Sequence, residues 1–214
     1  MKIAVFGCSW TAGSHPKYIS WVEELAKLKP EHTFVNYAIG GLSNSMIMAL
    51  AKKFKKEYDI SIVKLTSPGR LSFFNPKFNI DEQIKITTES NYHTWIDTST
   101  ILNNFVRLNY AYSNRSVSEP YSLKTIIKFH KMYYSYVNEE IFNVESEAAA
   151  HWCLNNVDLT YSHLAKHYQH LNIPVECAEK QIPYFKQYIY DHGYHVNQPG
   201  AIKEAEYIAN RLNL

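Results

Sequence analysis

Apolar residues follow two different periods along the first seventy positions of the chain. Short apolar runs rich in β-forming residues alternate with longer stretches in which apolar residues recur at helical spacing. The pattern predicts strands at 3–6, 33–39 and 60–66, a helix at 16–28, and a second helix capped by Ser43 or Asn44 that runs to about 58. Strands that alternate with helices in this way predict an α/β fold with a parallel sheet and right-handed crossovers.

The hydrophobic pattern is irregular from Arg70 to about Pro120, where aromatic residues, Asn, Ser and Thr dominate. A span of this length without periodicity is usually functional, so we interpret 71–120 as an insertion that forms a lid or a substrate wall over the carboxyl edge of the sheet. The later predicted elements are helices at 123–137 and 144–171, the latter with a possible break near 155–156, a strand at 173–177 and a helix at 199–212. No repeat or linker divides the chain, so we expect residues 1–214 to form a single domain.

Composition and charge narrow the classes of function. The chain has 214 residues, 46% of them hydrophobic, and a formal net charge of +2. A charge so close to neutral does not favour binding to a nucleic acid or to a membrane surface. We expect a cytoplasmic protein, because the first apolar run is too short for a signal peptide and no run approaches the length of a membrane span. Three cysteines without CxxC spacing argue against a disulfide framework and a cysteine metal site.

The first candidate for chemistry is Ser9, which follows the first predicted strand after Gly7 and Cys8. Open α/β sheets bind their ligands outside the carboxyl ends of the strands, so a serine at this position is a candidate nucleophile. The alternative is that Ser9 caps the next helix or bonds its own backbone. A serine nucleophile also needs a base and oxyanion donors. His195, in a loop before the last helix, is a plausible base.

Three segments resemble the blocks of the SGNH or GDSL-type hydrolase family. Gly7-Cys8-Ser9-Trp10-Thr11 is similar to the first block, 36–41 (Asn-Tyr-Ala-Ile-Gly-Gly) to the second, and 193–197 (Gly-Tyr-His-Val-Asn) to the last. The resemblance implies a three-layer, flavodoxin-like fold around a parallel sheet. It further implies that Ser9 is the nucleophile, that His195 is the general base, and that the backbone N–H groups of Ser9 and Gly41 hold the oxyanion.

The chain departs from the family pattern at three places. Cys8 stands where the first block has aspartate, and the segment 66–70 lacks the asparagine of the third block. By position, Asn44 or Arg70 is a candidate to replace that asparagine. In the last block, His192 occupies the usual aspartate position and Asp191 lies one residue further away. Either Asp191 or His192 orients His195, or the enzyme uses a Ser-His dyad.

Other chemistries have weaker support in the sequence. His192 and His195 are spaced for a zinc site, but no third ligand stands at a recognisable distance, so we expect no metal. Gly40-Gly41 precedes a helix without a phosphate-binding motif, and no cofactor is expected. Arg70 is a candidate to bind a carboxylate or phosphate of the substrate, or is simply a solvated arginine. His192 is a further candidate to face the substrate.

The sequence thus predicts a serine hydrolase that cleaves an O-acyl ester of a small molecule or carbohydrate, with an acetylated sugar as the first candidate. The many tyrosines agree with sugar or protein contacts, because a tyrosine side chain is apolar at one end and polar at the other. The alternative is a non-catalytic protein of the same fold that binds carbohydrate or has a structural role.

Overall fold

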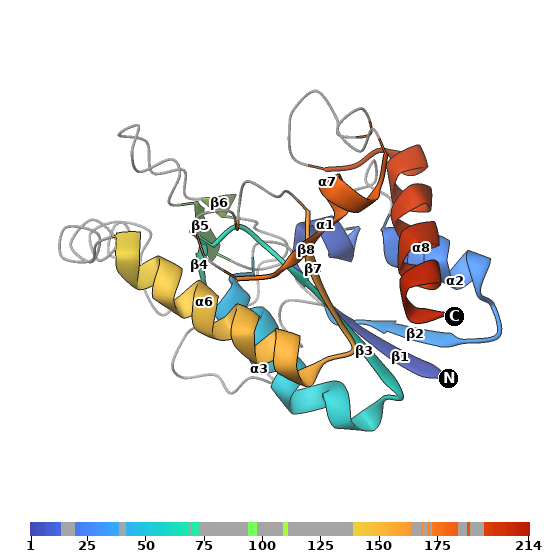
Figure 1. Ribbon diagram of the computed structural model, residues 1–214, viewed down its shortest axis with the longest axis horizontal. Coiled ribbons are helices and arrows are strands. Elements are labelled where there is room, and N and C mark those ends of the chain that lie inside the picture. Colours follow the sequence, from blue (N-terminus) through green and yellow to red (C-terminus); the bar gives the residue numbers. More distant parts are fainter. Residues whose placement is uncertain are drawn as a thin grey trace.

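A computed structural model of the chain describes residues 1–13, 20–38, 42–68, 70–72, 94–97, 109–110, 139–163, 168, 171, 173–183, 188 and 195–214. Its main sheet has five parallel strands in the order β2-β1-β3-β7-β8 (Figure 1). The strands are β1 (Lys2–Phe6), β2 (Thr33–Asn36), β3 (Ile60–Leu65), β7 (Leu159–Ser162) and β8 (Glu176–Cys177). This is the flavodoxin-like strand order, in which β1 and β3 flank the point where the winding direction reverses. The predicted α/β class and fold are confirmed.

Helices cover both faces of this sheet (Figure 1). On one face α2 (Trp21–Leu28) packs against α8 (Gln198–Leu212), and on the other α3 (Asn44–Phe54) packs against α6 (Glu139–Asn156). A short 3₁₀ helix, η1 (Lys55–Glu57), follows α3. The two faces bury separate apolar clusters, so the molecule has three layers.

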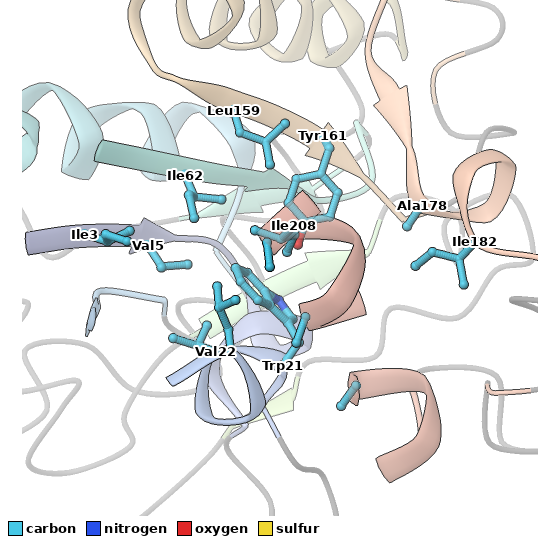
Figure 2. Close-up of a cluster of buried hydrophobic side chains, with 14 of the residues drawn as sticks. Ile3, Val5, Trp21, Val22, Ile62, Leu159, Tyr161, Ala178, Ile182 and Ile208 are labelled. Atoms are coloured by element: carbon cyan, nitrogen blue, oxygen red, sulfur yellow. The ribbon is translucent and has the colours of Figure 1, made fainter. Parts of the chain in front are cut away.

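Alternation along the strands creates the two clusters. Ile3 and Val5 contribute to the cluster under α2 and α8, whereas Ala4 and Phe6 contribute to the cluster under α3 and α6. Figure 2 shows the first cluster, in which side chains of β1, β3 and β7 meet those of α2 and α8. A parallel strand between two helical layers is apolar on both faces, which explains the continuous apolar run at the start of the chain.

Several predicted boundaries are wrong. The predicted helix at 144–171 is α6, which runs from Glu139 and ends at Asn156, at the predicted break, and β7 follows it. The side chains of Asn155 and Asn156 bond the carbonyls of His151 and Trp152 in this last turn. The predicted helix at 16–28 is described only from Trp21, with Ser20 extended at its N-cap. The predicted strands at 33–39 and 173–177 are shorter, as β2 and β8, and two four-residue helices were not predicted: α1 (Ser9–Ala12) and α7 (Ala178–Gln181).

The segment interpreted as an insertion contains a second, antiparallel sheet in the order β4-β5-β6. Its strands are β4 (Arg70–Ser72), β5 (Thr94–Asp97) and β6 (Asn109–Tyr110). The role of this segment as a lid stays a prediction, and the predicted helix at 123–137 lies outside the described residues. Within the part of the chain that the structure describes, no helix is both long enough and apolar enough to cross a membrane.

Candidate functional site

Ser9 lies just beyond the carboxyl end of β1, between β2 and β3 in the sheet. This is the place where doubly wound α/β sheets form their ligand crevice. Ser9 is partly exposed and is the first residue of α1, whereas Cys8 occupies the N-cap position and Ser20 caps α2. The alternative that Ser9 caps one of these helices is therefore wrong.

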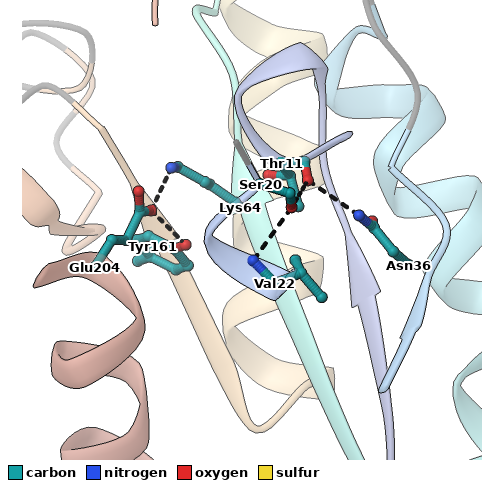
Figure 3. A network of polar contacts seen from close by, with 7 residues as sticks. All are labelled: Thr11, Ser20, Val22, Asn36, Lys64, Tyr161 and Glu204. Atoms are coloured by element: carbon teal, nitrogen blue, oxygen red, sulfur yellow. Dashed lines mark hydrogen bonds and ion pairs between the residues drawn. The ribbon is translucent and has the colours of Figure 1, made fainter. Parts of the chain in front are cut away.

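The short helix that carries Ser9 is fixed through the carbonyl of Thr11 (Figure 3). This oxygen accepts hydrogen bonds from Ser20 Oγ at 2.6 Å and from Asn36 Nδ2 at 3.0 Å. Thr11 also packs so closely on Gly7 that a Cβ atom at position 7 would lie 2.8 Å from Thr11 Cβ. Glycine is thus required at position 7 for α1 to fold back over the end of β1. Ser20 and Asn36 position Ser9 although neither was singled out in the sequence for this role.

His195 approaches the same place from the other end of the chain. It stands just before α8, whose N-cap Asn197 accepts a hydrogen bond from the Gly200 N–H at 3.0 Å. The imidazole stacks on the indole of Trp10, with ring centroids 5.7 Å apart and an interplanar angle of 29°. The neighbour of Ser9 in the sequence therefore contacts His195, which brings the predicted nucleophile and base to one region of the sheet edge.

Trp10 is also contacted by two residues that the sequence analysis missed. The ring of His163, directly after β7, lies edge-on to the indole, and Lys64 Nζ lies 5.7 Å from the indole centroid. Two histidines thus pack against one indole at the carboxyl edge of the sheet. The position of His163 directly after a strand could have marked it as a site candidate. It was missed because the residues of β7 fell within a predicted helix.

A buried ion pair lies next to Trp10. Lys64 of β3 and Glu204 of α8 are 1% and 0% exposed and pair through Nζ and Oε1, and the Tyr161 hydroxyl donates to the same oxygen at 2.7 Å (Figure 3). Burial lowers the pKa of Lys64, and the attraction of Glu204 only partly offsets this. Burial, followed by the charge of Glu204, raises the pKa of Tyr161. A buried ion pair therefore lies against Trp10, the neighbour of Ser9 in the sequence.

Asn44 serves a second buried network, on the opposite face of the sheet. Its Oδ1 accepts from the Thr66 N–H at 2.8 Å, and its Nδ2 donates to the Thr66 carbonyl at 3.2 Å and to the Tyr168 hydroxyl at 2.8 Å. Both amide hydrogens thus point to partners inside the protein. An oxyanion role for Asn44 would require these bonds to break, and it stays a prediction.

The other predicted site residues are not positioned by the described part of the chain. Gly41, Asp191 and His192 lie outside the described residues, as does the side chain of Arg70, whose backbone begins β4. The choice between a triad and a dyad therefore stays open. Among the residues that the structure describes, no cluster of three or more His, Cys, Asp or Glu side chains is arranged to hold a metal ion. All three cysteines are free and buried.

The chain matches no protein-family model, and no curated protein matches it. Among solved structures it is similar to the psychrotrophic esterase EstA from Pseudoalteromonas sp., in a crystal structure inhibited by monoethylphosphonate. The sequences are 11% identical, the TM-score is 0.42, and the comparison covers 100% of this chain and 99% of the esterase chain.

Proposed function

We propose that this protein is a serine ester hydrolase of SGNH type, with Ser9 as nucleophile and His195 as general base. The observation that carries the proposal is the stacking of His195 on Trp10, next to Ser9, at the reversal point of a flavodoxin-like sheet. The resemblance of the first, second and last sequence blocks to the SGNH family supports the same assignment.

In this proposal Ser9 Oγ attacks the carbonyl carbon of an ester while His195 accepts the hydroxyl proton. The negative charge on the carbonyl oxygen is held by the backbone N–H groups of Ser9 and Gly41. When the bond to the alcohol breaks, His195 returns the proton to the leaving oxygen. Water then attacks the acyl-enzyme in the same way and releases the acid. The first substrate class to test is an O-acetylated carbohydrate.

The decisive experiment combines labelling with kinetics. A fluorophosphonate probe should react with the native protein, and mass spectrometry of its peptides should place the adduct on Ser9. Hydrolysis of p-nitrophenyl acetate by Ser9→Ala should lose a factor on the order of 10⁴ to 10⁶ in kcat, and His195→Ala about as much, because the two residues act as a unit. Ser45→Ala, at a partly buried serine near the start of α3, is the matched control and should retain native turnover. Native turnover in Ser9→Ala would overturn the assignment.

The third member of the site is tested by comparing Asp191→Asn with His192→Ala. We propose that Asp191 orients His195, because an anion stabilises the imidazolium that forms during the reaction. The asparagine variant should then lose at least two orders of magnitude in kcat, and the alanine variant far less. An active Asp191→Asn enzyme would instead support the dyad.

A second candidate function is a non-catalytic carbohydrate-binding protein. The inward bonds of Asn44 favour it, because they engage one of the two residues expected to replace the missing oxyanion asparagine. A protein of this kind would ignore the fluorophosphonate probe and still bind sugar in a calorimetric titration.

A further inference from the structure

Trp10 occupies an unusual place, because it packs against both apolar clusters and against three groups that can carry positive charge. It contacts the clusters on both faces of the sheet. His195 stacks on the indole, His163 lies edge-on to it, and Lys64 Nζ lies within cation–π distance of it.

We propose that Trp10 is a positioning residue of His195, in addition to Asp191: its indole holds the imidazole beside Ser9 and stabilises the protonated form of the ring. This inference deepens the proposed hydrolase function and rests on it for the kinetic arm of the test only. Trp10 acts through His195 and takes no proton itself.

The physical basis is the quadrupole of the indole, whose face is negative. A neutral imidazole stacks on this face, and an imidazolium is attracted to it more strongly, as cations are to tryptophan in general. The same ring faces Lys64, whose charge alone would disfavour a second cation nearby. Glu204 pairs with Lys64 and removes most of that repulsion, so the indole remains available to the imidazolium.

The titration of His195 depends on the charged groups around it as well as on the indole. Among the described residues, the titratable groups near the Trp10–His195 pair are Cys8 before α1, His163 after β7, and Lys64 on β3 with its partners Glu204 on α8 and Tyr161 on β7. Asp191, which we propose as the partner of His195, lies outside the described residues. Substitution of Trp10 leaves each of these groups in the protein, so a change in the titration reports the indole.

The test uses NMR titration of the histidine ring protons in the full-length protein, with His195→Asn to assign the signal. In the native protein, the His195 ring protons should be shifted upfield by the ring current of the indole. Trp10→Leu should remove that shift and lower the titration midpoint by roughly 0.5–1 pH unit, the size of a partly desolvated cation–π contact. Trp10→Phe keeps an aromatic face of weaker quadrupole and should lower the midpoint by about half as much. Trp152→Leu, at an indole of α6 that lies under Lys52 and Lys55, is the matched control and should leave the signal unchanged.

The kinetic arm separates positioning from simple loss of structure. On p-nitrophenyl acetate, Trp10→Phe and Trp10→Leu should lower kcat by about 3- to 10-fold with little change in KM, and the acidic limb of the pH–rate profile should move with the NMR midpoint. A midpoint that moves by less than about 0.2 unit in Trp10→Phe and Trp10→Leu, or a native signal without a ring-current shift, overturns the inference. If the native protein hydrolyses no ester while the NMR effects are present, the proposed function fails and the role of Trp10 stands.

Discussion

The two faces of the central sheet bury polar groups in different ways near the end of β3. On the α2 and α8 face, Lys64 and Glu204 form an ion pair that Tyr161 completes. On the α3 and α6 face, the Asn44 amide bonds both backbone groups of Thr66 without any charge. Lys64 lies in β3 and Thr66 directly follows that strand, so the two networks meet the chain only two positions apart.

The two networks differ in the free-energy cost of burying them and of losing one partner. A buried ion pair costs several kcal/mol per ion to desolvate, and it is tolerated only while both partners are present. A neutral amide network loses one hydrogen bond at a time. The charged network also contacts Trp10, next to the candidate nucleophile, whereas the neutral one anchors α3 to β3. The costlier, charged network is thus the one that contacts Trp10, although Trp10 itself packs against the clusters on both faces.

The largest expected effect on stability comes from removing one partner of the Lys64–Glu204 ion pair. Glu204→Leu leaves the Lys64 ammonium buried without its partner and removes the acceptor of Tyr161. We expect a loss of about 3–5 kcal/mol in the free energy of unfolding, measured by urea denaturation followed through tryptophan fluorescence.

Two matched variants sharpen this prediction. The double variant Lys64→Met/Glu204→Leu removes both charges together and should recover most of the loss, since apolar replacement of a whole buried pair is often neutral. Glu206→Gln cuts an exposed ion pair with Lys203 on the same helix and should change stability little. A double variant as unstable as Glu204→Leu would show that packing, and not charge, is the dominant cost.

The neutral network should respond more mildly. Asn44→Ala removes its bonds to Thr66 and Tyr168 and leaves the buried Thr66 N–H without that acceptor, so we expect a loss of about 2–3 kcal/mol in the same urea assay. Ser146→Ala, which removes one donor to the Pro68 carbonyl, should cost about 1 kcal/mol. Asn155→Ala, at an exposed asparagine of α6, is the control. A loss in Asn44→Ala as large as in Glu204→Leu would remove the distinction between the faces.

The strands that carry these networks could be predicted where they depend on the local hydrophobic pattern. The runs that became β1 and β3 were recognised because a strand buried on both faces is apolar over its length. The edge strand β2 was recognised from Phe34 and Val35 and from the glycines that follow. β7 was missed because its four residues follow a helix without glycine or proline between them. The error hid His163 as well, since its position is meaningful only once the strand is known.

The two buried polar networks could not be predicted from the sequence, for a different reason. Lys64 and Glu204 are 140 residues apart, and each alone is typical of an exposed position. Likewise, Asn44 was a cap or oxyanion candidate by position, and its bonds to Thr66 and Tyr168 depend on the packing of three separate segments. Ser9 and His195 were proposed as site residues because their motifs are short and local, whereas the stacking of Trp10 on His195 depends on contact between the two ends of the chain.

A smaller effect is expected at the cap that joins α1 to the α2 and α8 face. Ser20 Oγ accepts from the Val22 N–H at 3.2 Å and donates to the Thr11 carbonyl, so Ser20→Ala removes a cap and a buried bond together. We expect a loss of about 1.5–2 kcal/mol. Asn197→Ala removes only the cap of α8 and should cost about 1 kcal/mol. Equal losses in the two variants would mean that the bond to Thr11 adds nothing to the position of α1.

The smallest expected effect is a difference between the two faces in how the free energy of unfolding changes at alkaline pH. Burial raises the pKa of Tyr168 well above its ordinary value, and the Asn44 hydrogen bond only partly opposes this. Below about pH 10 the phenol is protonated in both the folded and the unfolded chain, so its contribution to stability is fully present. Above that pH the unfolded chain binds fewer protons, and the contribution falls as pH rises toward the folded pKa, by about 0.8 kcal/mol at pH 10.5. Tyr168→Phe should remove this fall, seen as a flatter dependence of the urea midpoint on pH between 9 and 10.5.

Tyr161→Phe should flatten the dependence for the same reason, because burial raises the pKa of Tyr161 in the same direction. On the α2 and α8 face, however, the titration of Lys64 opposes this alkaline loss of stability. Its pKa is lowered by burial, so between the folded and unfolded values the unfolded chain binds more protons and stability rises with pH. In the Lys64→Met/Glu204→Leu background this opposing contribution is absent, and the alkaline fall should be steeper than in the native protein. A slope that is unchanged in that background would mean that Lys64 does not titrate in this range, and the charge on the α2 and α8 face would then persist through alkaline unfolding.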